Sequence, residues 1–182
     1  YGNQQNGING SIYLSSDIAT NGVAVGSRNG ETNLLGYDLT MQASNTATAD
    51  RYAQIGYRDV STGVASTGSI NIQLANTLTM TAGNAAVRNY VQIGHGGADG
   101  STTTGAGDLS GDIRIAADNG IFLNGGSGST QNYAQIGHGG RAAQAYGSGL
   151  IDIDAAGNIA LQAGNRSRAY AMIGHGGDAG HA

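Results

Sequence analysis

Apolar and polar residues alternate in short runs along this chain, and the runs come in groups of three. In the clearest group they occupy residues 112–116, 121–124 and 133–137. Alternation with a period of two is typical of a β-strand with one buried face. We therefore expect three short strands in each unit of the chain.

Two other groups follow this plan closely, and two earlier groups follow it less well. The close matches occupy residues 70–74, 78–81 and 90–94, and residues 151–154, 159–162 and 170–174. In the second group of the chain, the run around Asn33-Leu34-Leu35 is a poor strand before a good one at 39–42. The first group keeps strands at 12–14 and 23–26, with only Ile8 to indicate a further one. The sequence thus predicts three regular repeats after two degenerate ones.

A motif of eight residues, Tyr-Ala-Gln-Ile-Gly-His-Gly-Gly at 133–140, marks the end of each regular unit. It returns with small changes at 90–97 and 170–177, in a shortened form at 52–57 and in a faint form at 23–28. The tyrosines that open the four clear copies are 38, 43 and 37 residues apart. A short motif at a period near 40 is the sequence signature of a repeat array.

Three strands per repeat, joined by sharp corners, wind most simply into a solenoid. The connection at 117–120 contains Asn and Gly, which tolerate the left-handed backbone of tight corners. We expect an all-β protein, a right-handed parallel β-helix of about five coils. It forms a single domain over 1–182, with degenerate repeats over 1–60 and regular ones over 61–182. A β-propeller is the alternative at this period, but its blades carry four strands and bulky aromatics, whereas this chain has one Phe and no Trp.

In a solenoid, equivalent residues of successive coils lie above one another, so that a repeated residue becomes a row. The predicted inward rows are aliphatic, for example Ile113 and Ile115 beside Ile151 and Ile153. Burial of each such side chain contributes roughly 1.5–3 kcal/mol before chain entropy is counted. These rows define the fold and carry no information about activity.

The predicted outward rows of the motif strand consist of tyrosine and glutamine. Stacked amides can hydrogen-bond along the axis as a structural ladder, whereas a row of tyrosines can also form a flat face for sugar rings or a partner chain. Both interpretations apply to the same residues. These are Tyr52, Tyr90, Tyr133, Tyr170, Gln54, Gln92 and Gln135, with Met172 in the last repeat.

A histidine row, His95, His138 and His175, is the most attractive candidate for chemistry. Imidazole is the commonest protein ligand of transition metals. However, no Cys, Asp or Glu recurs beside the row to complete a ligand set, and Tyr57 replaces the imidazole in the second repeat. We expect a packing or hydrogen-bonding role, and we expect no cofactor, no metal and no catalytic residue.

Two carboxylates, Asp152 and Asp154, lie two residues apart on one predicted strand, about 6.6 Å from each other. Paired carboxylates at that separation suit glycoside hydrolysis. No other acidic residue recurs with them, and Arg114 occupies the neighbouring row, so an exposed ion pair is the simpler interpretation. A carbohydrate-active or carbohydrate-binding β-helix remains the alternative function.

Composition excludes several classes of protein. The chain has 33 Gly but no Pro, which does not match collagen, and it has no Cys to form disulfides or thiolate metal sites. Charged residues make up 11% and the formal net charge is −4, so there is no electrostatic footprint for nucleic acid. No window approaches the roughly 20 apolar residues of a membrane span.

Two segments, 111–117 and 157–164, together with the Tyr-Ala-Gln-Ile-Gly-His-Gly-Gly motif, resemble repeats of filamentous-haemagglutinin-type bacterial exoproteins. The similarity is clear over residues 65–177 and weak over the first 60. It implies a parallel β-helix that is exported through a partner transporter in the outer membrane and acts as an adhesin or matrix fibre. The secretion domain of that family is not recognisable in this sequence.

The predicted end coils lack caps, and the chain has no Pro and no Lys, the residues that usually protect open strand edges. The chain also starts at Tyr1 rather than Met, as a processed or excised piece would. We therefore expect a structural extracellular fibre or adhesin module on a bacterial surface. Its partners are copies of itself stacked head to tail, or flanking coils of a longer chain, with a cell-surface glycan as a further candidate.

Overall fold

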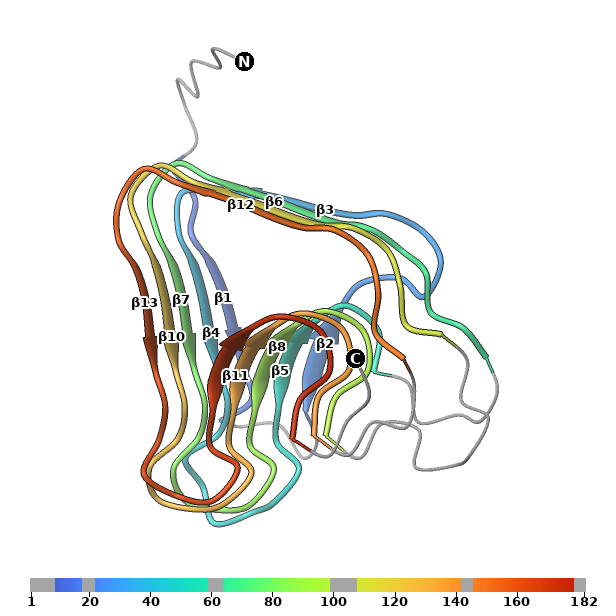
Figure 1. Cartoon of the computed structure of the whole chain (residues 1–182). Coiled ribbons are helices and arrows are strands. Elements are labelled where there is room, and N and C mark those ends of the chain that lie inside the picture. Colours follow the sequence, from blue (N-terminus) through green and yellow to red (C-terminus); the bar gives the residue numbers. More distant parts are fainter. Residues whose placement is uncertain (1–8, 18–21, 59–63, 99–107, 142–145, 179–182) are drawn as a thin grey trace.

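The computed structural model describes residues 9–17, 22–58, 64–98, 108–141 and 146–178. All regular structure within these ranges is β-strand, and the strands form three parallel sheets (Figure 1). The expected parallel β-helix is therefore confirmed. A propeller is ruled out because strands from every repeat pair in shared sheets rather than in separate blades.

Each sheet takes one strand from each coil. Sheet A consists of β1 (Ile12–Ser15), β4 (Leu39–Gln42), β7 (Leu78–Thr81), β10 (Ile121–Asn124) and β13 (Ile159–Gln162). Sheet B consists of β2 (Val23–Val25), β5 (Ala53–Ile55), β8 (Val91–Ile93), β11 (Ala134–Ile136) and β14 (Ala171–Ile173). Sheet C consists of β3 (Thr32–Gly36), β6 (Ile70–Leu74), β9 (Ile113–Ala117) and β12 (Ile151–Ala155).

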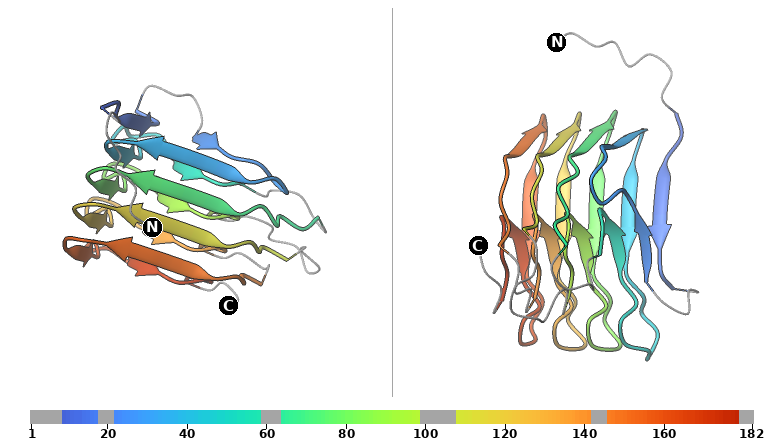
Figure 2. Two further views of the ribbon diagram at one scale, coloured as in Figure 1. Left: turned by 90° about the horizontal axis from the view of Figure 1, so that it is seen from above. Right: turned by 90° about the vertical axis from the view of Figure 1, so that its right-hand side faces the viewer.

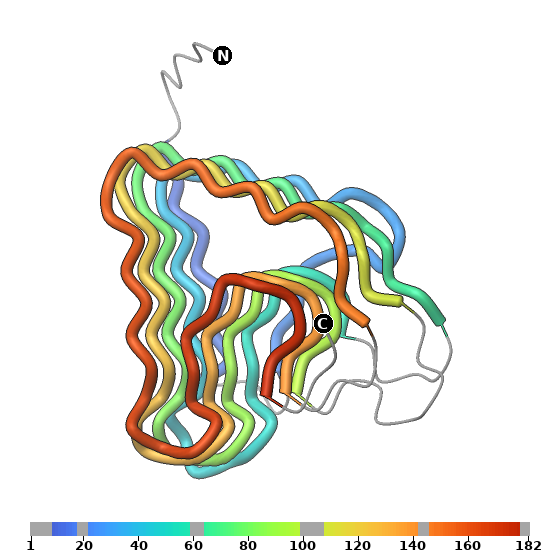
Figure 3. The backbone as a smooth tube through the Cα atoms, in the orientation of Figure 1, coloured from blue at the N-terminus to red at the C-terminus, as the bar shows by residue number. Residues whose placement is uncertain are grey.

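The coils follow the predicted repeats. Within the described residues, coil 1 contributes β1 and β2, and coils 2 to 5 contribute β3–β5, β6–β8, β9–β11 and β12–β14. Successive coils lie flat on one another, as the side views in Figure 2 and the superposed tubes in Figure 3 show. The segment that was a poor strand by pattern forms β3, with Leu35 56% exposed on its outer side. The first-coil strand suggested by Ile8 lies outside the described residues.

The core fills the space between the three sheets with aliphatic rows in strict register. Ile72 pairs with Ile115, which pairs with Ile153, while Ile93 pairs with Ile136 in sheet B. The members from the middle coils are almost fully buried. The predicted inward rows are therefore correct, and the apolar column continues through every coil.

Glycines at the end of sheet B let successive coils approach closely. Gly137 has a φ of +148°, and a Cβ atom there would lie 1.9 Å from the carbonyl oxygen of Gly174 in the next coil. Any larger residue would have both a strained backbone and a steric clash. This explains why Gly follows the repeated Ile at positions 56, 94 and 137, where the next coil lies against the glycine.

Candidate functional site

The residues after each strand of sheet B cover the outer face of that sheet. We call residues 94–98, 137–141 and 174–178 the return segments. Parallel bridges link them from coil to coil, from Gly96 to Gly139 and from Gly139 to Gly176. Ala98 of the first return segment packs in a small second core with Tyr90 and Tyr133. Sheet B is thus buried on both faces in the middle coils.

The tyrosine and glutamine rows leave sheet B on its outer side, but in the middle coils the return segments bury them. The residues with no exposed surface are Tyr90, Tyr133, Gln54, Gln92 and Gln135. A binding face for sugar rings needs accessible rings, so these rows cannot provide one there. Tyr52 and Tyr170, at the two ends of the row, are partly buried.

The four tyrosine rings form a continuous stack. Their centroids are 5.1, 4.8 and 4.8 Å apart from Tyr52 to Tyr170, and neighbouring planes differ by no more than 10°. Burial raises the pKa of the Tyr90 and Tyr133 hydroxyls well above the ordinary value. Both hydroxyls therefore stay protonated and serve as hydrogen-bond donors.

The last three tyrosines of the stack, Tyr90, Tyr133 and Tyr170, each donate to the glutamine of the preceding coil. The Tyr90 hydroxyl lies 3.2 Å from Gln54 Oε1, and the Tyr133 hydroxyl lies 3.2 Å from Gln92 Oε1. The amide nitrogen of Gln92 in turn donates to the carbonyl oxygen of Gly137 in the following coil at 3.0 Å. Glutamine therefore links a hydroxyl and a carbonyl group of the next coil, and the network satisfies polar groups that would otherwise be buried without partners.

The three histidines form a second stack, with centroids 5.0 Å apart at both steps. The backbone N–H of His95 donates to His138 Nδ1 at 3.0 Å, and that of His138 donates to His175 Nδ1 at 3.1 Å. On the other side of the ring, His138 Nε2 lies 2.8 Å from the carbonyl oxygen of Gly111. Because an N–H can only donate and a carbonyl can only accept, Nδ1 is the acceptor and Nε2 carries the proton.

This arrangement makes each histidine a clasp that closes its own coil. Gly68, whose carbonyl oxygen lies 2.7 Å from His95 Nε2, precedes sheet C, whereas His95 follows sheet B. The hydrogen bond joins the start and the end of one turn of the solenoid. The equivalent pairs are His138 with Gly111 and His175 with Gly149.

At His138 the clasp leaves no lone pair for a metal ion. Both nitrogens of His138 are engaged, and burial, the largest influence, lowers its pKa to about 4. Among the described residues no group of three or more His, Cys, Asp or Glu is arranged to hold a metal. The histidine row therefore acts as a hydrogen-bonding column within the described part of the chain.

A buried asparagine ladder was missed by the sequence reasoning. Asn89 Oδ1 accepts from the backbone N–H of Arg51, and Asn132 Oδ1 accepts from the backbone N–H of Asn89, both at 2.9 Å. The Asn132 amide also donates to the carbonyl oxygens of Gly83 and Ala86. The available signal was an Asn directly before the motif tyrosine in two successive repeats.

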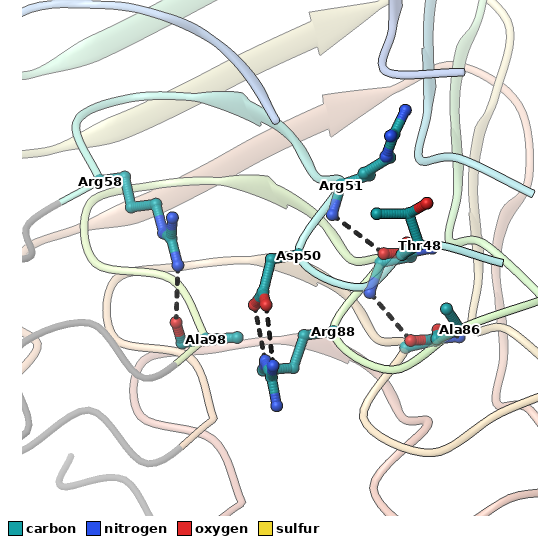
Figure 4. Close-up of polar contacts among 9 residues, drawn as sticks. Thr48, Asp50, Arg51, Arg58, Ala86, Arg88 and Ala98 are labelled. Atoms are coloured by element: carbon teal, nitrogen blue, oxygen red, sulfur yellow. Dashed lines mark hydrogen bonds and ion pairs between the residues drawn. The ribbon is translucent and has the colours of Figure 1, made fainter. Parts of the chain in front are cut away.

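Charged side chains lie at the edge of these ladders (Figure 4). Arg88 Nε lies 2.6 Å from Asp50 Oδ1 and its Nη2 lies 2.7 Å from Oδ2, and this contact holds the pKa of Asp50 below its usual value. Arg58 lies over the ring of Tyr52 at 4.6 Å and covers the outer end of the tyrosine stack. Both pairs are partly exposed, so they contribute little to the stability of the fold.

The outer face of sheet C carries the remaining candidate residues. Asp152 and Asp154 are exposed and line an open depression of about 320 Å³ together with Asn33, Asn71 and Arg114. Asp152 lies beside Arg114 in register, but the ion pair recorded for Arg114 is with Asp112, at 2.5 Å. The depression spans several coils, and its walls mix polar side chains with apolar surface.

Comparisons of the chain with protein-family models, with curated proteins and with solved structures find no match. The described residues also contain no helix that is long and apolar enough to cross a membrane. The function must therefore be argued from the geometry of this chain alone.

Proposed function

We propose that this chain is a structural module of an extended extracellular fibre or adhesin, in which its coils form part of a longer stack. The observation that carries the proposal is the set of ladders that run from coil to coil. Tyrosine, glutamine, histidine and asparagine side chains each form hydrogen bonds to the coil before or after their own. These side chains therefore hold successive coils together.

The burial between successive coils supports the same role. Ile121 and Leu123 of β10 lie between two neighbouring coils and are fully buried. Burial of such side chains contributes roughly 1.5–3 kcal/mol each. Each coil inside the chain is therefore stabilised by the coil placed on it.

The histidine, tyrosine and glutamine side chains of the motif are committed to structure, which argues against catalysis by these rows. His138 is buried with both nitrogens bonded, and Tyr133 and Gln92 bond each other inside the second core. Catalysis requires groups that can reach a substrate, and these cannot.

Carbohydrate binding is the second candidate, and the depression on sheet C favours it. Its walls carry amide, guanidinium and carboxylate groups from Asn71, Arg114 and Asp152, which suit the hydroxyls of a sugar chain running along the axis. In an adhesin, this surface would contact a cell-surface glycan while the stacked coils provide length.

Immunogold electron microscopy of the producing cells tests the structural role. Antibodies against this chain should label extracellular filaments or a surface matrix, whereas label confined to the cell interior would contradict the proposal. Incubation of the purified chain with polysaccharides should release no reducing ends. A glycan array compares the two candidates, because binding that is lost in Asp152→Ala would support the sheet C surface.

A further inference from the structure

The outer face of sheet A carries no charged side chain. Its outward residues form two rows across the five strands, and no other described segment lies outside this sheet (Figure 1). The outer face of sheet C differs, because arginine and aspartate side chains point outward there. The rows of sheet A are Tyr13, Thr40, Thr79, Phe122 and Ala160, and Ser15, Gln42, Thr81, Asn124 and Gln162.

The polar side chains in the middle of this face have no partner among the described residues. Thr40, Thr79, Thr81 and Asn124 are partly exposed, and none of them forms a side-chain hydrogen bond within the described ranges. On sheet C, by contrast, the outward Asn71 amide donates to a neighbouring asparagine at 2.9 Å. Sheet A therefore offers hydroxyl and amide groups that are available to an outside molecule.

Two aromatic rings lie along the same face. The Tyr13 hydroxyl donates to Gln42 Oε1 in the next coil at 3.1 Å, so this ring leans along the solenoid axis. The Phe122 ring lies over Gly120, where a Cβ atom would be 3.0 Å from two ring carbons. Both rings belong to one row, three coils or about 14 Å apart. Rings held against a sheet in this way offer a flat side to a partner.

These features suit a neutral polysaccharide. The C–H groups of a pyranose ring pack on the negatively polarised face of an aromatic ring, and its hydroxyls both donate and accept hydrogen bonds. A charged glycan would find no opposite charge on the two rows.

The size of the face argues against a second copy of the chain as its occupant. Five strands of four residues span roughly 250 Å². In a stable protein complex each partner buries about 800 Å². A single extended sugar chain needs much less area, and a straight, flat face matches the ribbon shape of a β-1,4-linked polymer.

We propose that the outer face of sheet A binds a neutral, β-1,4-linked polysaccharide that runs along the solenoid axis, across the strands. Its sugar rings stack on Tyr13 and Phe122, and the hydroxyls between these rings bond to Thr79, Thr81 and Asn124. This activity goes beyond the proposed structural role. It also uses a different surface from the charged depression on sheet C.

Depletion of the purified protein from solution by insoluble polysaccharides tests this proposal. Cellulose, mannan and chitin are the neutral β-1,4-linked probes, and a polygalacturonate gel is the acidic one. The protein should bind at least one neutral probe, equally at low and high salt, because no ion pair contributes. Binding to none of the three, or tighter and salt-sensitive binding to polygalacturonate, would overturn the proposal.

Two arginine substitutions in coil 3 locate the binding surface. Thr79→Arg places a charge at the centre of the sheet A face, and Gln73→Arg makes a matched change on the outer face of sheet C. Binding should weaken about tenfold or more in the first variant and stay nearly unchanged in the second. An equal loss in both, or a larger loss in Gln73→Arg, would place the glycan elsewhere and overturn the inference.

Phe122→Ala removes one stacking ring without adding a charge. Binding should weaken about fivefold, and unchanged binding would contradict the stacking. Thermal unfolding checks that each variant is folded, and Thr81→Arg in the second row replaces Thr79→Arg if that variant is not. Sedimentation tests the other occupant, because self-association that is lost in Thr79→Arg would show that a second copy covers this face and would overturn the proposal.

Discussion

The histidine clasp predicts that the solenoid loses stability in mild acid. Protonation of His138 would add a proton to Nδ1, the atom that now accepts the backbone N–H of His95. Two donors would then face each other. Its pKa is lowered to about 4, mainly by burial. The neighbouring rings of His95 and His175 lower it further, whereas the Gly111 carbonyl and the Asp112 carboxylate raise it.

The size of the stability loss and the pH range over which it occurs follow from the pKa of His138. An ordinary histidine has a pKa near 6.5, so the gap corresponds to about 3 kcal/mol at this one residue. Because the unfolded chain binds the proton more readily, the contribution is complete above pH 6.5 and is lost as the pH falls toward 4. The carboxylates with lowered pKa, such as Asp50, lose their contributions at lower pH, so the two effects separate.

The assay is chemical unfolding of the protein and of His138→Asn at pH 7 and pH 4.5, followed by tyrosine fluorescence. Asparagine keeps an acceptor near the position of Nδ1 but does not titrate. The variant should be less stable at pH 7, and its stability should fall less on acidification, by about 2–3 kcal/mol. An NMR titration that places the His138 pKa near 6.5, or an equal loss in both proteins, would refute the reasoning.

Three further substitutions probe other parts of the stack, each measured as a change in the free energy of unfolding. Tyr133→Phe removes the hydroxyl that Gln92 accepts in a buried site and should cost about 1–3 kcal/mol; a loss under 0.5 kcal/mol would contradict the ladder. Gly137→Ala should cost about 3 kcal/mol or more through the clash with the next coil, whereas Gly10→Ala, with no neighbouring atom within 4 Å, should be close to neutral. Arg88→Ala should cost at most about 1 kcal/mol, because its ion pair is partly exposed, and a larger loss would show that the edge is structural.

The sequence was sufficient to predict the three strands, the coil period and the inward rows. These features depend on local alternation and on repetition, both of which are visible along the chain. The strand β3 was the least certain because Asn33-Leu34-Leu35 breaks the alternation, yet it pairs with β6 over five residues. Its neighbours in the stack impose the register that its own residues specify poorly, which is tertiary context overriding local propensity.

The burial of the tyrosine and glutamine rows could not be predicted from a period-two pattern. Alternation shows which side of a strand a residue leaves from, but not whether another segment of the chain later covers that side. The covering segments consist of Gly-His-Gly-Gly, and their glycines let the backbone lie directly on the tyrosine rings. A Cβ atom at Gly97 would lie 2.3 Å from the hydroxyl of Tyr90.

The burial of these rows could have been inferred from the repetition of the same residue, although not from its polarity. An exposed position needs only a polar residue, so it has no physical reason to keep the same side chain from coil to coil. The outer rows of sheet A behave in this way, since Tyr13, Thr40 and Phe122 share one column. The motif column keeps tyrosine in four coils that stack ring on ring, and the hydroxyls of the last three reach a glutamine in the coil before. Repetition of an identical polar residue from coil to coil in this solenoid therefore indicates a buried ladder.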